Sequence, residues 1–173
     1  MRKFDNMRSR VEAERPLVGF IVGGGHYAVD VPAVREIVAP VALVMVPHAS
    51  PIVIGVTDHR GHVVPVVNLR KRFGLPPAEA SVRSKWIIVE TDSQWLGLAV
   101  DGVTEVFSVN ATMERMAPRL GPDDVARGFS RVYSHDGHLV MVLDLAVIGR
   151  AVEQGSEAVP LPSLAPPSPE NVR

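Results

Sequence analysis

The chain repeats itself, and this duplication constrains its fold more than any other feature. The segment HRGHVVPVVNL at residues 59–69 is matched by HDGHLVMVLDL at residues 135–145. Upstream of these hairpins, AVDV at 28–31 and VREI at 34–37 are matched by AVDGVTEV at 99–106. Each copy predicts about five short strands and one helical turn. Short, numerous strands cover their edges best by closing into small barrels, so we expect an all-β protein of two similar barrels that share an apolar seam.

Residues 55–74 indicate what each copy builds. Valine-rich runs on both sides of a polar turn at residues 58–61 predict a β-hairpin. Asn68 is expected to cap a short helix over residues 69–73. Arg60 lies at the tip of this apolar hairpin, where its guanidinium needs a carboxylate partner, either in its own fold or on another protein.

The same reasoning predicts the other elements. Gly23–Gly25 forms a turn between the first two strands, and a helical turn from Pro32 to Ile37 projects Glu36 to one side. A phosphate site at the glycines is disfavoured, since a strand follows them where a helix is needed. Strands are expected at residues 17–22, 27–31, 38–46, 86–90, 95–100, 103–109, 129–133 and 138–143, with a final helix at 144–150.

These elements predict one domain between two irregular ends. Residues 1–15 are charged and poor in apolar side chains, so we expect a mobile arm. Residues 151–173 are proline-rich and predict a disordered tail. The domain itself, 16–150, is expected to divide into barrel subdomains at about 16–83 and 84–150.

Composition excludes several classes of function. The formal net charge is −1, which gives no nucleic-acid footprint, and the chain has no cysteine, which excludes disulfides and thiolate chemistry. No apolar run reaches the roughly 18 residues of a membrane span, and the N-terminus has no apolar signal region. A cytoplasmic protein without membrane insertion is therefore expected.

Candidate chemistry is sparse. The pairs His59/His62 and His135/His138 repeat one spacing across two turns and could hold zinc or nickel if the turns met. Recurrence of turn-friendly residues explains the same pattern, so no metal or other cofactor is expected. The contiguous Ser134-His135-Asp136 cannot converge as a triad, and no G-x-S-x-G motif or P-loop is present. Asp30 and Asp101 occupy equivalent repeat positions but are unconvincing as an acid–base pair. We expect no enzymatic activity.

Three motifs of the chain resemble those of the CheW family of chemotaxis coupling proteins. The family pattern G-V-x-N-L-R-G-x-x-x-P-V-x-D-L is matched by GVTDHRGHVVPVVNL at residues 55–69. Y-x-I-x-x-x-x-V-x-E-I is matched within residues 27–37, and G-L-x-V-D-x-V-x-E-V by residues 97–106. The resemblance covers about residues 16–150 and implies two SH3-like five-stranded β-barrels packed together.

The resemblance also implies a function. Family members are non-enzymatic adaptors that link chemoreceptor cytoplasmic tips to the regulatory domain of a CheA-type histidine kinase. By this resemblance Arg60 and Glu36 form a functional charged pair. The positions that match the receptor groove and kinase interface are Val31, Val34, Gly55, Gly97, Val103 and Val106. A plain core role for the valines remains the alternative.

Two departures from the family pattern concern partner choice. Asp58-His59 replaces the usual Asn-Leu, and Asn68 replaces the usual Asp. The first change places a carboxylate and a titratable ring beside Arg60. Two alternatives to the adaptor therefore stay open: a kinase-binding regulator without receptor coupling, and a histidine-based metal-binding protein.

Overall fold

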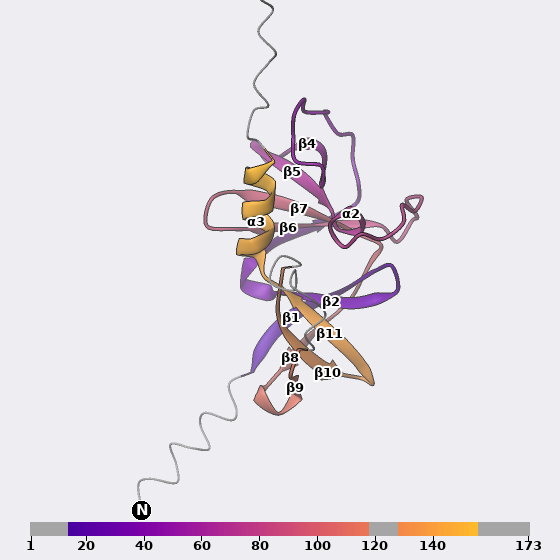
Figure 1. Cartoon of the computed structure of the whole chain (residues 1–173), viewed down its shortest axis with the longest axis vertical. Coiled ribbons are helices and arrows are strands. Elements are labelled where there is room, and N and C mark those ends of the chain that lie inside the picture. Colours follow the sequence, from indigo (N-terminus) through magenta and orange to yellow (C-terminus); the bar gives the residue numbers. More distant parts are fainter. Residues whose placement is uncertain (1–13, 118–127, 156–173) are drawn as a thin grey trace, which may run out of the picture.

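The computed structural model describes residues 14–117 and 128–155, which form two β-sheets (Figure 1). The first sheet has the strand order β8-β1-β2-β11-β10-β9 and the second β3-β6-β7-β5-β4. The first sheet contains β1 (Arg15–Val22), β2 (Gly25–Asp30), β8 (Gly102–Val109), β9 (Glu114–Arg115), β10 (Phe129–His135) and β11 (His138–Leu143). The second contains β3 (Val34–Val38), β4 (Val53–His59), β5 (His62–Asn68), β6 (Lys85–Glu90) and β7 (Trp95–Val100).

The described residues contain few helical segments, and these are short. They are two 3-10 turns, η1 (Val31–Ala33) and η2 (Ala111–Met113), and two α-helices, α2 (Leu69–Arg72) and α3 (Leu145–Gln154). Asn68 caps α2 by accepting a hydrogen bond from the Lys71 backbone N–H, as predicted. Asp144 caps α3 in the same way, because the repeat places a capping side chain after the last strand of each hairpin.

The duplication is visible in the topology, and the all-β fold of two barrel-like sheets is confirmed. In each sheet a hairpin (β6–β7 or β1–β2) pairs in parallel with the second strand of the repeated hairpin (β5 or β11). Read along the strand orders, β3-β6-β7-β5-β4 corresponds to β8-β1-β2-β11-β10. The two sheets therefore share a five-strand arrangement, to which the first sheet adds β9 at one edge.

The predicted subdomain boundaries, 16–83 and 84–150, are wrong. The hairpin β6–β7 completes the sheet of β3, β4 and β5, while β1–β2 completes the sheet of β8 to β11. Each sheet therefore takes strands from both halves of the sequence. Consecutive strands pair locally as hairpins, but which sheet a hairpin joins depends on long-range parallel pairing that sequence spacing does not specify.

Side-chain alternation builds a shared core. Along β5, Val66 packs with Trp86 and Ile88 in a cluster inside the barrel that the second sheet forms. The next residue, Val67, faces the opposite way and packs into the cluster between the sheets. The other sheet has its own interior cluster around Leu17 and Val142. The cluster between the sheets takes residues from both sheets and from both α-helices: Val18, Phe20, Val22, Tyr27, Val29, Val67, Leu69, Ile87, Val89, Leu96, Leu98, Val100, Leu143 and Ile148. This cluster is the predicted apolar seam.

Two predicted elements differ from the structure. The helical turn at 32–37 is only η1, since β3 already begins at Val34. The strand at 38–46 ends at Val38, and beyond it only Val44 forms an isolated bridge, with Val56. Proline 40 cannot donate to a sheet ladder, which accounts for the break.

The predicted ends need adjustment too. Strand β1 begins at Arg15, inside the predicted arm, and α3 continues to Gln154, inside the predicted tail. Residues 1–13 of the arm and 156–173 of the tail lie outside the described residues.

Asp101 ties the two sheets together where the chain passes from β7 to β8. Its carboxylate accepts hydrogen bonds from Arg70 of α2 at 2.7 and 2.9 Å and from the Gly23 backbone N–H at 2.7 Å. The Arg70 guanidinium is the main reason why the pKa of Asp101 lies below its usual value. Asp101 therefore serves the junction between the two sheets.

We expect Asp101→Asn to lower the free energy of unfolding by about 1 kcal/mol near neutral pH, because the charged hydrogen bonds are partly screened by solvent. A carboxyl with a lowered folded pKa stabilises the fold above its unfolded pKa of about 3.9 and loses that effect as pH falls through the folded value. The difference from the unsubstituted protein should therefore disappear in acid. Urea unfolding at several pH values measures it, with Asp92→Asn in an exposed turn as the control; an unchanged gap between pH 7 and pH 2.5 would contradict this role.

Candidate functional site

The tip of the β4–β5 hairpin holds Arg60 in a fixed position. His59 pairs with His62, which leaves Arg60-Gly61 as a two-residue loop. Both loop residues have positive φ, 53° for Arg60 and 81° for Gly61, as in a type I′ hairpin turn. The Asp58 carboxylate accepts the Gly61 backbone N–H at 2.9 Å. Asp58, one of the departures from the family pattern, thus stabilises the turn.

Glu36 of β3 is the carboxylate partner that Arg60 was predicted to need. Arg60 Nε donates to Glu36 Oε2 at 2.9 Å and Nη2 to Oε1 at 3.1 Å. This bidentate pair holds the pKa of Glu36 below its usual value. Since β3 and β4 stand at opposite ends of the strand order, the pair also links the two ends of its sheet.

His59, the last residue of β4, completes this cluster. Its Nε2 lies 2.9 Å from Glu36 Oε2, and its side chain is only 14% exposed. The Arg60 side chain, in contrast, is 72% exposed. Among the described residues, its Nη1 donates no hydrogen bond. The arrangement therefore presents a guanidinium that is fixed on one side and open to an acceptor on another molecule.

Aromatic and charged side chains flank the tip. His62 stacks on Trp95 with ring centroids 3.9 Å apart, and the Arg35 guanidinium lies 6.0 Å from the Trp95 ring. Arg35 also forms an ion pair with Glu90. These contacts make the end of the second sheet a mixed surface of guanidinium, imidazole and indole.

Three of the four predicted valines lie at the seam, and the fourth is exposed. Val31, Val34 and Val103 are partly buried and pack against the cluster between the sheets. Val106 on β8 is 66% exposed. The first three therefore contribute to the core and to its rim together, while Val106 is free of the core.

The two predicted glycines are buried. A Cβ on Gly97 would lie 3.2 Å from a Val66 methyl, inside the second sheet. A Cβ on Gly55 would lie 2.8 Å from the Val44 carbonyl oxygen, and Gly55 has φ of 149°. Both positions favour close packing over direct contact with a partner.

Sequence reasoning missed an exposed apolar segment beside β4. Val41, Val44, Met45 and Val46 are 58%, 67%, 77% and 41% exposed, where a strand was predicted. The nearby Pro40 and Pro47 were the available signal, because they exclude a central strand. We call residues 41–46 the apolar segment.

The two histidine pairs do not meet. His59 and His62 belong to the second sheet, and His135 and His138 to the first. His138 instead stacks on His26 of β2, with ring centroids 4.0 Å apart.

Within the described parts of the chain, no helix has the length and apolar character needed to cross a membrane.

Known proteins are similar to this chain in sequence. The family model for the CheW-like domain matches residues 16–153. The chain is 33% identical over 132 residues to the chemotaxis protein CheW of Rhizobium meliloti, covering 76% of this chain and 84% of that protein. It is 28% identical over 155 residues to the chemotaxis protein CheW of Bacillus subtilis, covering 89% and 98%.

A solved structure agrees with the fold. The scaffolding protein TtCheW from Thermoanaerobacter tengcongensis superposes with a TM-score of 0.68 at 29% identity, covering 75% of this chain and 88% of that one. The family match takes in every strand except the first residue of β1, and it includes the Arg60 turn and the seam. On this combined evidence of sequence and fold, the chain belongs to the family of CheW-like domain proteins.

Proposed function

We propose that the chain is a non-enzymatic adaptor that couples chemoreceptors to a CheA-type histidine kinase in a cytoplasmic signalling array. Family membership over residues 16–153 is the observation that carries this proposal. The exposed guanidinium of Arg60, held by Glu36 on a rigid turn, supports it because such a group suits recognition of a carboxylate on a partner.

The kinase regulatory domain binds at the end of the second sheet in this proposal. The apolar segment lies there beside β4, where Val44 bridges Val56. Several side chains of the apolar segment are more than half exposed. Arg60 lies at the tip of the β4–β5 hairpin, whose strand β4 the segment contacts. An apolar centre with a charged neighbour is the usual composition of a transient protein interface.

The receptor tip binds along the seam. Val31, Val34 and Val103 form a partly exposed apolar rim on the shared core, and Val106 adds an exposed methyl surface on β8. A helical hairpin presents apolar side chains at helical spacing and can bury them on such a rim. Weak contacts to each partner become effective together through avidity in an array.

Binding of the two partners, measured side by side, tests the proposal. We expect the full chain to bind both an isolated kinase regulatory domain and a receptor cytoplasmic tip by calorimetry. Binding to the kinase domain alone would favour the regulator without receptor coupling, and binding to neither would contradict both functions.

Val106→Asp should separate the two surfaces. We expect it to weaken receptor binding at least about tenfold, because an unpaired carboxylate would enter an apolar interface. Kinase binding and the melting temperature should stay unchanged, since Val106 is 66% exposed and outside the core. Val82→Asp, at a 95% exposed position, is the matched control; equal receptor affinity in both variants would remove Val106 from the interface.

A further inference from the structure

The duplication has copied one ion-pair cluster into both sheets, with a change of charge. In the second sheet, Glu36 of β3 meets His59 at the end of β4. In the first sheet, the equivalent Glu105 of β8 meets His135 at the end of β10, with Nε2 and Oε1 3.2 Å apart. Both contacts connect opposite regions of the strand order in the same way. The Glu–His contact is therefore a feature of the repeat.

The residue after the histidine differs between the copies. In the second sheet it is Arg60, whose guanidinium neutralises Glu36. In the first sheet it is Asp136, in the same type of turn with φ of 46° followed by Gly137 with φ of 76°. Asp136 Oδ2 lies 3.7 Å from His135 Nε2. One copy thus contains its own cation, and the other gathers two carboxylates around an imidazole.

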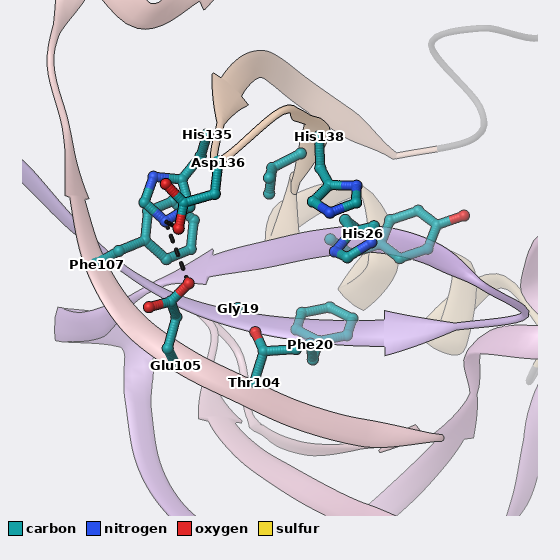
Figure 2. A pocket seen from close by; sticks show the side chains of 11 residues that line it. Gly19, Phe20, His26, Thr104, Glu105, Phe107, His135, Asp136 and His138 are labelled. Atoms are coloured by element: carbon teal, nitrogen blue, oxygen red, sulfur yellow. Dashed lines mark hydrogen bonds and ion pairs between the residues drawn. The ribbon is translucent and has the colours of Figure 1, made fainter.

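In the described part of the first sheet, no side-chain cation takes the place of Arg60. Among the described residues, the ion-pair partner of both Glu105 and Asp136 is His135, and the surrounding pocket of about 250 Å³ contains neither lysine nor arginine. Figure 2 shows the three side chains converging at one side of this group of lining residues. A site of this composition attracts a positive ion.

We propose that Glu105, His135 and Asp136 bind a divalent transition-metal ion, with Zn²⁺ as the representative ion. Imidazole nitrogen with carboxylate oxygens is a ligand set that zinc accepts. Bonds of about 2.0–2.2 Å in a tetrahedral site place neighbouring donors about 3.3–3.5 Å apart. The three donor atoms here all lie within 4.8 Å of one another, so small side-chain rotations suffice to close the site.

The histidine ligand is already oriented. The Phe107 ring stacks on His135 with centroids 4.0 Å apart and planes at 12°. This packing fixes the imidazole with Nε2 toward Glu105, as the dashed contact in Figure 2 shows. His26 and His138 line the same pocket but stack on each other. The bound ion would connect β8 to the β10–β11 turn and so close the first barrel where Arg60 closes the second.

The substitution Asp136→Arg tests the inference, because it restores the residue type found at Arg60. We expect the untagged full chain to bind about one Zn²⁺, with a rise in melting temperature of about 5–10 °C at a free ion concentration near 100 times the dissociation constant. Asp136→Arg should lose this binding and this shift, while its melting temperature without metal stays equal or rises. His135→Ala and Glu105→Gln should each weaken binding at least about tenfold, and the exposed Glu105 position keeps the fold intact.

Three results would overturn the inference. One is no saturable Zn²⁺ binding by the unsubstituted chain. Another is a Zn²⁺ affinity of Asp136→Arg and of Glu105→Gln that equals the affinity of the unsubstituted chain. The third is loss of binding in His26→Ala or His138→Ala with normal binding in His135→Ala, which would place the ion on the stacked pair. The matched control His62→Ala, at the tip of the other hairpin, should bind Zn²⁺ as the unsubstituted chain does.

Discussion

Replacing Leu98 with alanine should lower the free energy of unfolding by about 2–5 kcal/mol. Leu98 lies on β7, is completely buried and belongs to the cluster between the sheets. Its removal leaves a cavity that touches residues of both sheets, so the loss cannot be confined to one barrel. Chemical unfolding followed by two probes, tryptophan fluorescence and far-UV circular dichroism, should give one shared transition at a lower denaturant concentration.

Val63→Ala is the matched control for this prediction. Val63 lies on β5 in the same sheet but is 74% exposed, so its removal should change the free energy of unfolding by less than about 0.5 kcal/mol. Separate transitions for the two probes in Leu98→Ala would show that the sheets are independent units, which contradicts a shared core.

Reversing the charge of Arg60 should have the largest effect on function. We expect Arg60→Glu to weaken kinase binding at least about tenfold, because like charges would face each other both at Glu36 and at the partner's carboxylate. The fold should persist, since the Arg60 side chain is 72% exposed and the turn is stabilised by Asp58. Calorimetric titration with the kinase regulatory domain measures the affinity, and circular dichroism verifies the fold.

Two further variants make this prediction specific. Arg131→Glu is the control, because Arg131 also pairs with a glutamate, Glu114, but on the other sheet. The exchange Glu36→Arg with Arg60→Glu restores the pair in reverse. Normal affinity in the exchange variant would show that the pair matters only for the turn; persistent loss would show that the partner contacts the guanidinium. A melted spectrum for Arg60→Glu alone would contradict the interface role.

Local features of the fold were predictable because they depend on few neighbouring residues. The hairpin around Arg60 followed from a polar turn between valine runs, and the α2 cap followed from Asn68. The assignment of β6–β7 and β1–β2 to their sheets was not predictable, because it depends on parallel pairs between strands far apart in sequence. The valine-rich stretch at 38–46 misled the strand prediction, since β-propensity favours a strand that Pro40 interrupts.

The candidate site was predictable in part. The need of Arg60 for a carboxylate and its match with Glu36 were confirmed by the bidentate contact. The cluster of Glu105, His135 and Asp136 could have been found by carrying the Glu36–Arg60 pairing through the repeat alignment. It was missed because the histidines were considered as pairs within each turn, whereas the fold brings each first histidine to a glutamate of another strand.

In the proposed function, one molecule of this chain holds a receptor tip and a kinase regulatory domain at different surfaces. Sedimentation velocity of the full chain mixed with both partners tests this claim most directly. We predict a complex that contains all three proteins and that disappears when this chain is omitted. If either partner instead displaces the other, so that only two-protein complexes sediment, the two surfaces are one and the proposed coupling is contradicted.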